Sequence, residues 1–227
     1  MMMDQLAVIF DMDGVLVDSE PWHYKVEELI YAELGIEVPD KVHQLYLGTA
    51  ADLMWSDLKK RYGLKPSLEE LVKYDEEFRV GFFSDLGNLQ PNPGVKKLLS
   101  GLSDANIPMA VATSSVPGIV DIILEQCGIR SFFDAVVTTV QAGKSKPAPD
   151  VYLYAAGKLE HEPSSCLVFE DSMNGIRAAV DAGMTCVAFQ PEGAVQHDIS
   201  AAHHFITDFR HISPETIRRW VTNKQFS

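Results

Sequence analysis

The chain has 227 residues, of which 46% are hydrophobic and 22% are charged, and this composition is that of a globular protein. The formal net charge of -13 argues against a nucleic-acid surface, where Lys and Arg must neutralise phosphates. No stretch approaches the roughly 20 apolar residues that a membrane span needs. We therefore expect no nucleic acid and no membrane among the partners of this protein.

The three cysteines, Cys127, Cys166 and Cys186, are odd in number and lack the spacing of a metal site. Cys166 and Cys186 open apolar runs, so we expect buried thiols and, by default, a reducing compartment. Residues Met1 to Leu6 show neither a basic region nor a long apolar stretch, so we expect no signal peptide there. The predicted location is cytoplasmic, and the predicted oligomeric state is a monomer.

The first element in chain order is an apolar run over Leu6–Asp11. The region that follows, from about Ser19 to Leu89, shows helical patterns and no strand pattern. The turn Pro91–Gly94 closes it. We interpret this region as a helical insert between the first strand and the rest of a sheet. The predicted domains are a helical cap over residues 18–92 and an α/β core over residues 1–17 and 93–227.

After the insert, four more apolar runs alternate with stretches of helical length and period. The runs are continuous in hydrophobicity, which is typical of strands covered on both faces. Helical spacing recurs between them, as in Ile119, Ile122 and Ile123. Strand–helix alternation of this kind predicts an α/β fold with a doubly wound, Rossmann-like parallel sheet. The four runs are Pro108–Thr113, Ala135–Thr139, Cys166–Glu170 and Thr185–Gln190.

Polar residues of particular types stand where these runs end. Ligands of open α/β sheets bind outside the carboxyl ends of the strands, so these residues should meet at one edge. Packed carboxylates raise one another's pKa unless a cation offsets them, and Mg²⁺ with oxygen ligands is the natural choice. Hydroxyls and a lysine suit a phosphate, and the combination points to phosphoryl transfer. The residues at the run ends are Asp11 and Asp13, Thr113 with Ser114 and Ser115, and Glu170 with Asp171, and Lys146 lies between the third and fourth runs.

Each of these residues also has a purely structural explanation. Asp-x-Asp-Gly can be a turn, and Lys146 precedes a proline, which favours the first turn of a helix. Ser114 and Ser115 could cap the helix that begins near Pro117, and Asp171 or Ser172 could cap the next helix. All of these features coincide at strand ends, and that coincidence favours a functional site.

The same residues carry a family resemblance. The segment Phe10–Glu20 resembles the first motif of the haloacid dehalogenase-like superfamily, and Ala112–Ser115 resembles its second motif. Lys146-Pro147 resembles the third motif and Phe169–Ser172 the fourth, in matching order over essentially the whole chain. The helical insert is similar to the alpha-helical cap of the branch that contains beta-phosphoglucomutase and many sugar-phosphate phosphatases.

The resemblance implies a role for each motif residue. Asp11 would be the nucleophile, and Asp13 would be the general acid/base. A magnesium ion would be held by Asp11, the backbone carbonyl of Asp13 and Asp171, with Glu170 binding directly or through water. The phosphoryl oxygens would be bound by Thr113, the Ser114 backbone and Lys146, and Asn174 would support the metal loop.

The predicted activity is a Mg²⁺-dependent phosphatase that hydrolyses small phosphomonoesters, sugar or polyol phosphates first, through an aspartyl-phosphate. The alternatives are a beta-phosphoglucomutase-type phosphomutase and a pseudouridine or nucleotide monophosphatase. A non-enzymatic phosphoacceptor module is a further alternative, although Asp13 and the helical insert count against it. The mutase needs a cap cation, yet Leu47 and Ala51 stand at the two basic positions around Gly48. Lys59, Lys60, Arg61 or Arg79 could supply that charge instead.

The cap carries further candidates. His23 matches a cap histidine of the mutase, and it is either a cap–core hydrogen-bond partner of Asp13 or an exposed helix histidine. The aromatic residues Trp22, Trp55 and Tyr46, together with Met54, are expected in the cap core. We expect the cap to move about linkers at Val17–Ser19 and Leu89–Pro93, and residues around Leu45–Trp55 to select the substrate.

Overall fold

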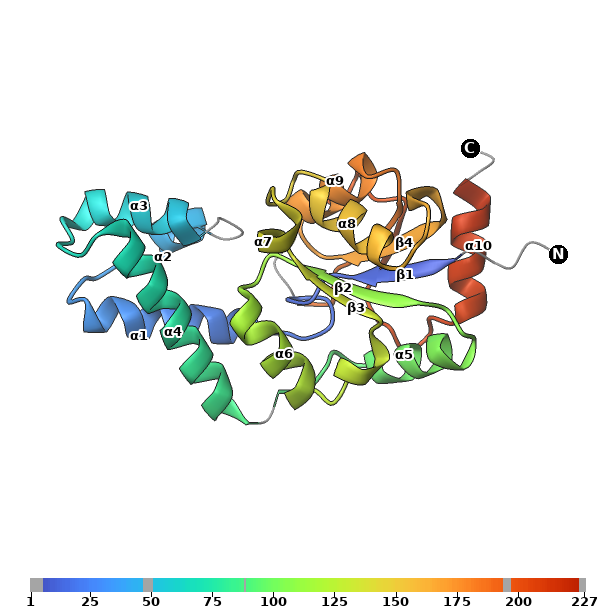
Figure 1. The fold of residues 1–227 in the computed structure, drawn as a ribbon, viewed down its shortest axis with the longest axis horizontal. Helices are drawn as coiled ribbons and strands as arrows, with labels where there is room; N and C mark the ends of the chain where they lie inside the picture. The colour runs from blue at the N-terminus through green and yellow to red at the C-terminus, as the bar shows by residue number, and fades with distance from the viewer. Residues whose placement is uncertain (1–5, 47–50, 88, 194–196, 225–227) are drawn as a thin grey trace.

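The structure is a computed structural model that describes residues 6–46, 51–87, 89–193 and 197–224. A helical domain lies beside a larger α/β domain, and the last helix, α10 (Pro214–Lys224), lies at the far end of the α/β domain from the helical one (Figure 1). The α/β domain is built on a six-stranded sheet of order β3-β2-β1-β4-β5-β6 in which every neighbouring pair is parallel. The predicted doubly wound α/β fold is confirmed.

Five of the six strands match the predicted runs to within one residue at either end. The short sixth strand had no predicted run. Every residue of β1, β2, β4 and β5 is buried, which explains their continuous hydrophobicity. Strand β6 was not predicted, because three residues at a sheet edge, only one of them buried, leave no periodic signal. The strands are β1 Ala7–Phe10, β2 Met109–Thr113, β3 Ala135–Thr138, β4 Cys166–Glu170, β5 Thr185–Phe189 and β6 His204–Ile206.

Helices cover both faces of the sheet. The larger hydrophobic cluster packs one face of the strands against α5 (Val95–Asp104), α6 (Pro117–Gln126) and α10 (Pro214–Lys224). A smaller, alanine-rich cluster packs the other face against α8 (Asp150–Lys158) and α9 (Met173–Asp181). The remaining core helix, α7, spans Thr139–Ala142. Its first residue was wrongly included in the third strand, because the chain turns where the Thr138 N–H donates to Gln141 Oε1 at 3.0 Å.

The helical domain corresponds to the predicted cap, and its described residues hold no strand. Its helices are α1 (Glu20–Glu33), α2 (Asp40–His43), α3 (Ala51–Tyr62) and α4 (Leu68–Leu86), with a short 3-10 turn, η1, over Gln44–Tyr46.

The cap core contains most of the side chains predicted for it. Trp55, Tyr46 and Met54 are buried as predicted. Trp22 was wrongly placed in this core: it is 38% exposed. It lies in the first turn of α1, ahead of the buried Val26 and Ile30, and leans against Phe82 with ring centroids 6.4 Å apart.

The two segments predicted as linkers are joined to each other. Val17 forms an antiparallel bridge with Pro91, and the Asn92 N–H donates to the Leu16 carbonyl at 2.8 Å. The Asn92 side chain also donates to the Gly14 and Val15 carbonyls at 3.0 and 2.8 Å. The chain therefore leaves and re-enters the core at one point, next to the end of β1.

The cysteines are free and buried, as predicted. Within the described part of the chain, no helix has both the length and the apolar character needed to cross a bilayer.

The turn that closes the cap offers a test of this packing. Gly94 has φ of +90°, and a Cβ there would lie 2.4 Å from the Arg210 backbone nitrogen. Gly183 has φ of +80°, but a Cβ there would meet no heavy atom within 4 Å. Gly94→Ala should lower the free energy of unfolding by about 2–3 kcal/mol, because it adds a backbone clash to the left-handed strain. Gly183→Ala should lower it by about 1 kcal/mol, from the strain alone.

Chemical denaturation of the two variants measures this difference. Equal losses of stability would contradict the close approach of Gly94 to the segment that precedes α10.

Candidate active site

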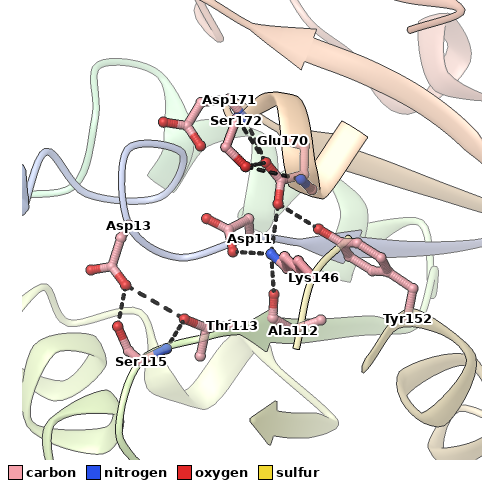
Figure 2. A network of polar contacts seen from close by, with 11 residues as sticks. Asp11, Asp13, Ala112, Thr113, Ser115, Lys146, Tyr152, Glu170, Asp171 and Ser172 are labelled. Carbon is pink, nitrogen blue, oxygen red and sulfur yellow. Dashed lines mark hydrogen bonds and ion pairs between the residues drawn. The ribbon is translucent and has the colours of Figure 1, made fainter. Parts of the chain in front are cut away.

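Three of the predicted site residues stand at the carboxyl ends of three adjacent strands (Figure 2). Asp11 follows β1 directly, Thr113 ends β2 and Glu170 ends β4. Phe10 is level with Val111 on one side and with Phe169 on the other, so the three strands end close together. The acids and the hydroxyl therefore lie close together at the carboxyl ends of these strands, as their positions in the sequence predicted.

Lys146 connects these acids. Its Nζ donates to Asp11 Oδ1 and to Glu170 Oε1, both at 2.6 Å, and to the Ala112 carbonyl at 3.3 Å. The Lys146 side chain is only 8% exposed, and the Tyr152 ring lies 4.9 Å from its Nζ. The peptide bond between Lys146 and Pro147 is cis. Lys146 does not begin a helix, since α8 starts at Asp150.

Both carboxylate oxygens of Glu170 are engaged. Oε1 accepts from Lys146 and from the Tyr152 hydroxyl at 2.8 Å. Oε2 accepts from the Asp171 N–H and the Ser172 N–H, both at 2.9 Å, and from the Ser172 hydroxyl at 3.0 Å. A Cβ at Gly175 would lie 1.7 Å from Oε1, so a side chain there would displace this carboxylate. Glu170 is fully buried and held by five donors.

Ser172 also caps α9, because its hydroxyl accepts from the Gly175 N–H at 3.0 Å. Of the two caps considered, Ser172 is thus correct and Asp171 is not, and the cap coexists with the contact of Ser172 to Glu170. The corresponding explanation for Ser114 and Ser115 is wrong, since Val116 is the N-cap of α6 and no side chain caps that helix.

Asp13 is surrounded by hydrogen-bond donors from both domains. On Oδ1 it accepts from the Ser19 hydroxyl at 2.5 Å and faces His23 Nε2 at 3.1 Å. On Oδ2 it accepts from the Ser115 hydroxyl and, at 3.4 Å, from the Thr113 hydroxyl (Figure 2). One carboxylate oxygen of Asp13 therefore contacts residues of the cap, and the other contacts residues of the core.

His23 is a cap–core hydrogen-bond partner, so the first of its two interpretations holds. Its Nδ1 lies 3.1 Å from Arg79 Nη1 on α4. A guanidinium can only donate, so Nδ1 must accept. The ring proton then resides on Nε2, and His23 donates it to Asp13.

The two aspartates of the first motif have opposite electrostatic environments. Burial, reinforced by the charges of Glu170 and Asp13, outweighs Lys146 and raises the pKa of Asp11 to about 8. Burial alone would also raise the pKa of Asp13. The His23 imidazole and the hydroxyls of Ser115 and Ser19 outweigh that effect and lower the pKa of Asp13 to about 2.

The neighbouring acids differ in the same way. Burial and the charges of Glu170 and Asp11 raise the pKa of Asp171 well above its usual value. Burial would do the same to Glu170, but Lys146 and its other donors outweigh it and lower the pKa of Glu170. Asp11 and Asp171 are thus the acids whose charges are least compensated by the protein.

The arrangement of these acids fits a divalent cation. Oxygen atoms of Asp11, Glu170 and Asp171 lie within 4.8 Å of one another. Gly14 makes room for the group, because a Cβ there would lie 2.1 Å from Asp171 Oδ2. Oxygen ligands and uncompensated negative charge are what a hard ion such as Mg²⁺ requires.

The other predicted residues have varied positions. Thr113 is buried beside Asp13, whereas Ser114 and Asn174 are exposed, Asn174 in the first turn of α9. Gly48 lies outside the described residues, as does the rest of segment 47–50.

Four residues make contacts in the site that were not predicted. Ser19 stands inside a recognised motif but had no assigned role, and Ser115 was considered only as a phosphate-binding hydroxyl or a helix cap. Tyr152 gave no signal and Arg79 was considered only as a cation for a second phosphate, because both meet their partners only through the tertiary fold. Tyr152 contacts Glu170 from α8, and Arg79 contacts His23 from α4.

The fold and the site together resemble those of a phosphotransferase, with buried acids, a lysine and a carboxylate cluster that could hold a cation at the carboxyl ends of parallel strands. A family model described as haloacid dehalogenase-like hydrolase matches residues 6–183. The chain belongs to this family. It is a phosphoric monoester hydrolase of the branch with an α-helical cap.

Three similar proteins illustrate the relationship. YhcW of Bacillus subtilis is 36% identical over 182 residues, which cover 80% of this chain and 81% of YhcW. The phosphorylated carbohydrates phosphatase of Thermotoga maritima is 33% identical, over 78% of this chain and 82% of that protein. The solved beta-phosphoglucomutase of Clostridium difficile superposes with a TM-score of 0.80, covers 97% of this chain and 99% of its own, and is 22% identical. The last likeness concerns the fold alone.

The raised pKa of Asp11 has a consequence for stability without metal. Between its unfolded pKa of roughly 4 and its folded value of about 8, the folded state binds the extra proton. The free energy of unfolding in EDTA should therefore fall as pH rises through this window. Asp11→Asn removes the group, so its advantage over the wild type should grow from near zero at pH 4 to on the order of a few kcal/mol at pH 8.

Denaturation at both pH values measures the effect, with Asp85→Asn at an exposed position of α4 as the control. An advantage of Asp11→Asn that did not change with pH would contradict the electrostatic environment described for Asp11.

Proposed function

We propose that this protein is a Mg²⁺-dependent phosphatase of small phosphomonoesters, with sugar and polyol phosphates as its preferred substrates, and that it acts through an aspartyl-phosphate on Asp11. The observation that carries the proposal is the pairing of Asp11 with Lys146 and of Asp13 with a separate set of donors. Two neighbouring carboxylates in different environments can take different roles in one reaction.

Asp11 would act as the nucleophile. Its carboxylate oxygen attacks phosphorus, the bond between phosphorus and the ester oxygen breaks, and the leaving alkoxide takes a proton from Asp13. Lys146, the Thr113 hydroxyl and the Ser114 N–H would bind the phosphoryl oxygens during transfer. In the second step Asp13 accepts a proton from water, the water oxygen bonds to phosphorus, and the bond to Asp11 breaks to release orthophosphate.

The hydrogen bonds to Asp13 favour its ionised form, which is the form needed to activate water. The acid form needed for the first step would arise when some of these donors turn to the substrate. Exchange of donors between Asp13 and the bound ester would therefore link substrate binding to proton transfer.

A magnesium ion would neutralise the charge of Asp11 and Asp171 and of the transferring phosphoryl group. Asp11, Asp171 and the backbone carbonyl of Asp13 are proposed as its direct ligands. Glu170 is proposed to bind through water, because five donors already engage its two oxygens.

The cap cations favour a phosphatase over a phosphomutase, which must hold a second phosphate. Among the described residues, Arg79 is buried against two carboxylates, Arg61 pairs with an aspartate of its own helix, and Lys59 donates to backbone carbonyls. Lys60 is exposed. Three of the four candidate cations thus have partners within the cap, and the relatives named above include a phosphatase of phosphorylated carbohydrates.

The direct test is phosphate release from a panel of sugar, polyol and nucleoside monophosphates, with and without Mg²⁺. We expect turnover of sugar or polyol phosphates that is abolished by EDTA and by Asp11→Asn. Isomerisation of glucose 1-phosphate in the presence of a bisphosphate primer, without phosphate release, would support the mutase instead. Turnover restricted to nucleoside or pseudouridine phosphates would refute the proposed substrate class.

The role of Asp13 gives a sharper prediction. Asp13→Asn should lower kcat/KM for an alkyl phosphate by about 10²–10⁴-fold, because the alkoxide must be protonated as it leaves. For p-nitrophenyl phosphate, whose phenolate leaves without a proton, the loss should be clearly smaller. Asp18→Asn, at an exposed position of the same motif, is the control. Equal losses for both esters would exclude Asp13 as the acid.

A further inference from the structure

Cap helix α4 contacts the core as well as the cap. It packs against α1 and α3 within the cap and against core helix α6, which lies beside its second half (Figure 1). At Gly118, in the first turn of α6, a Cβ would lie 2.7 Å from Cγ2 of Val80 on α4. The two helices approach closely here because position 118 carries no side chain.

A second contact joins the same helices at the other end of α6. Gln126, its last residue, donates from Nε2 to the Phe83 backbone carbonyl at 2.7 Å. This carbonyl is among the last four of α4, which lack intrahelical partners, so a core side chain satisfies a free acceptor of a cap helix. Gly118 and Gln126 lie at opposite ends of α6, so the two contacts hold one turn of α4, from Val80 to Phe83, against that helix.

The docked part of α4 is also the part that holds His23. The Phe83 ring is fully buried and packs on the His23 ring, with centroids 5.0 Å apart. Arg79 donates to His23 Nδ1, and its own position is set by Asp75 and Glu27, each at 2.9 Å. Both the plane of the imidazole and its Nε2–H tautomer thus depend on α4.

We propose that the docking of α4 on α6 positions His23 for its hydrogen bond to Asp13. Gly118 and Gln126 of the core, with Val80 and Phe83 of the cap, are then positioning residues for the general acid/base. The inference rests on the proposed function, in which Asp13 transfers the protons. The position of the cap relative to the core then depends on the contact between α4 and α6 as well as on the linkers. Any movement of the cap must either rotate about this contact or break it.

Two pairs of variants test the docking. Gly118→Ala inserts a methyl group against Val80, and the double variant Gly118→Ala/Val80→Ala makes room for it. Alanine favours a helix more than glycine does, so Gly118→Ala does not weaken α6 itself. Gln126→Met keeps the side-chain length but removes the donor to Phe83. Its matched control is Glu125→Met, the same new side chain at the preceding, exposed position.

The first readout does not depend on turnover. Nitrogen-15 NMR of the imidazoles at one fixed pH, with the His23 signals assigned by their loss in His23→Gln, reports the tautomer of His23. We expect the Nε2–H pattern in the wild type, in Glu125→Met and in the double variant. In Gly118→Ala and Gln126→Met the signals should move toward an average of the two tautomers.

The second readout is the ratio of kcat/KM for an alkyl phosphate to that for p-nitrophenyl phosphate. Misplacing the proton donor should lower this ratio on the order of tenfold in Gly118→Ala and Gln126→Met. The double variant should regain it. A contact that merely stabilises the fold would lower both rates equally and leave the ratio unchanged.

The two readouts separate this inference from the proposed function. Unchanged His23 signals in both Gly118→Ala and Gln126→Met would overturn the inference, whatever the activities are. A wild type that hydrolysed no phosphomonoester would overturn the proposed function, while the imidazole signals would still decide whether α4 positions His23.

Discussion

The ion contacts of Lys146 with Asp11 and Glu170 are the interaction on which the candidate active site depends. Three acids meet there in a largely buried space, and an uncompensated buried charge costs several kcal/mol. One lysine offsets part of that charge, and the donors around Glu170 stabilise one acid completely. The negative charge that remains uncompensated lies on Asp11 and Asp171. The protein therefore presents a site whose remaining negative charge calls for a cation.

The same edge separates the two aspartates of the first motif. Asp11 faces the lysine and the acids, and Asp13, two residues later, faces hydroxyls and an imidazole. The parallel sheet makes this possible, because the ends of β1, β2 and β4 bring side chains from distant parts of the chain to one place. Two identical side chains can then differ in pKa and in proposed role through their surroundings alone.

The cap contributes to the different surroundings of Asp11 and Asp13 through one long helix, α4, which contacts both domains. Helix α4 packs inside the cap, docks on α6 and holds the imidazole that faces Asp13. Its arginine is fully committed to cap carboxylates and to His23, so it is poorly suited to bind a second phosphate. The contacts of this one guanidinium within the cap therefore support the proposed phosphatase over a phosphomutase.

The sequence by itself determined five of the six strands and their alternation with helices, the helical insert, the acids and hydroxyl at the strand ends, and the lysine between the third and fourth strands. Continuous apolar runs and residues at their ends are local patterns, so they can be read without a structure. Only the tertiary structure decided that Trp22 is exposed, that β6 extends the sheet, and that His23 faces Asp13. It also decided that Tyr152 engages Glu170 and that Arg79 fixes the tautomer of His23. These contacts join residues far apart in the chain, and no local pattern encodes which side chains meet across two domains.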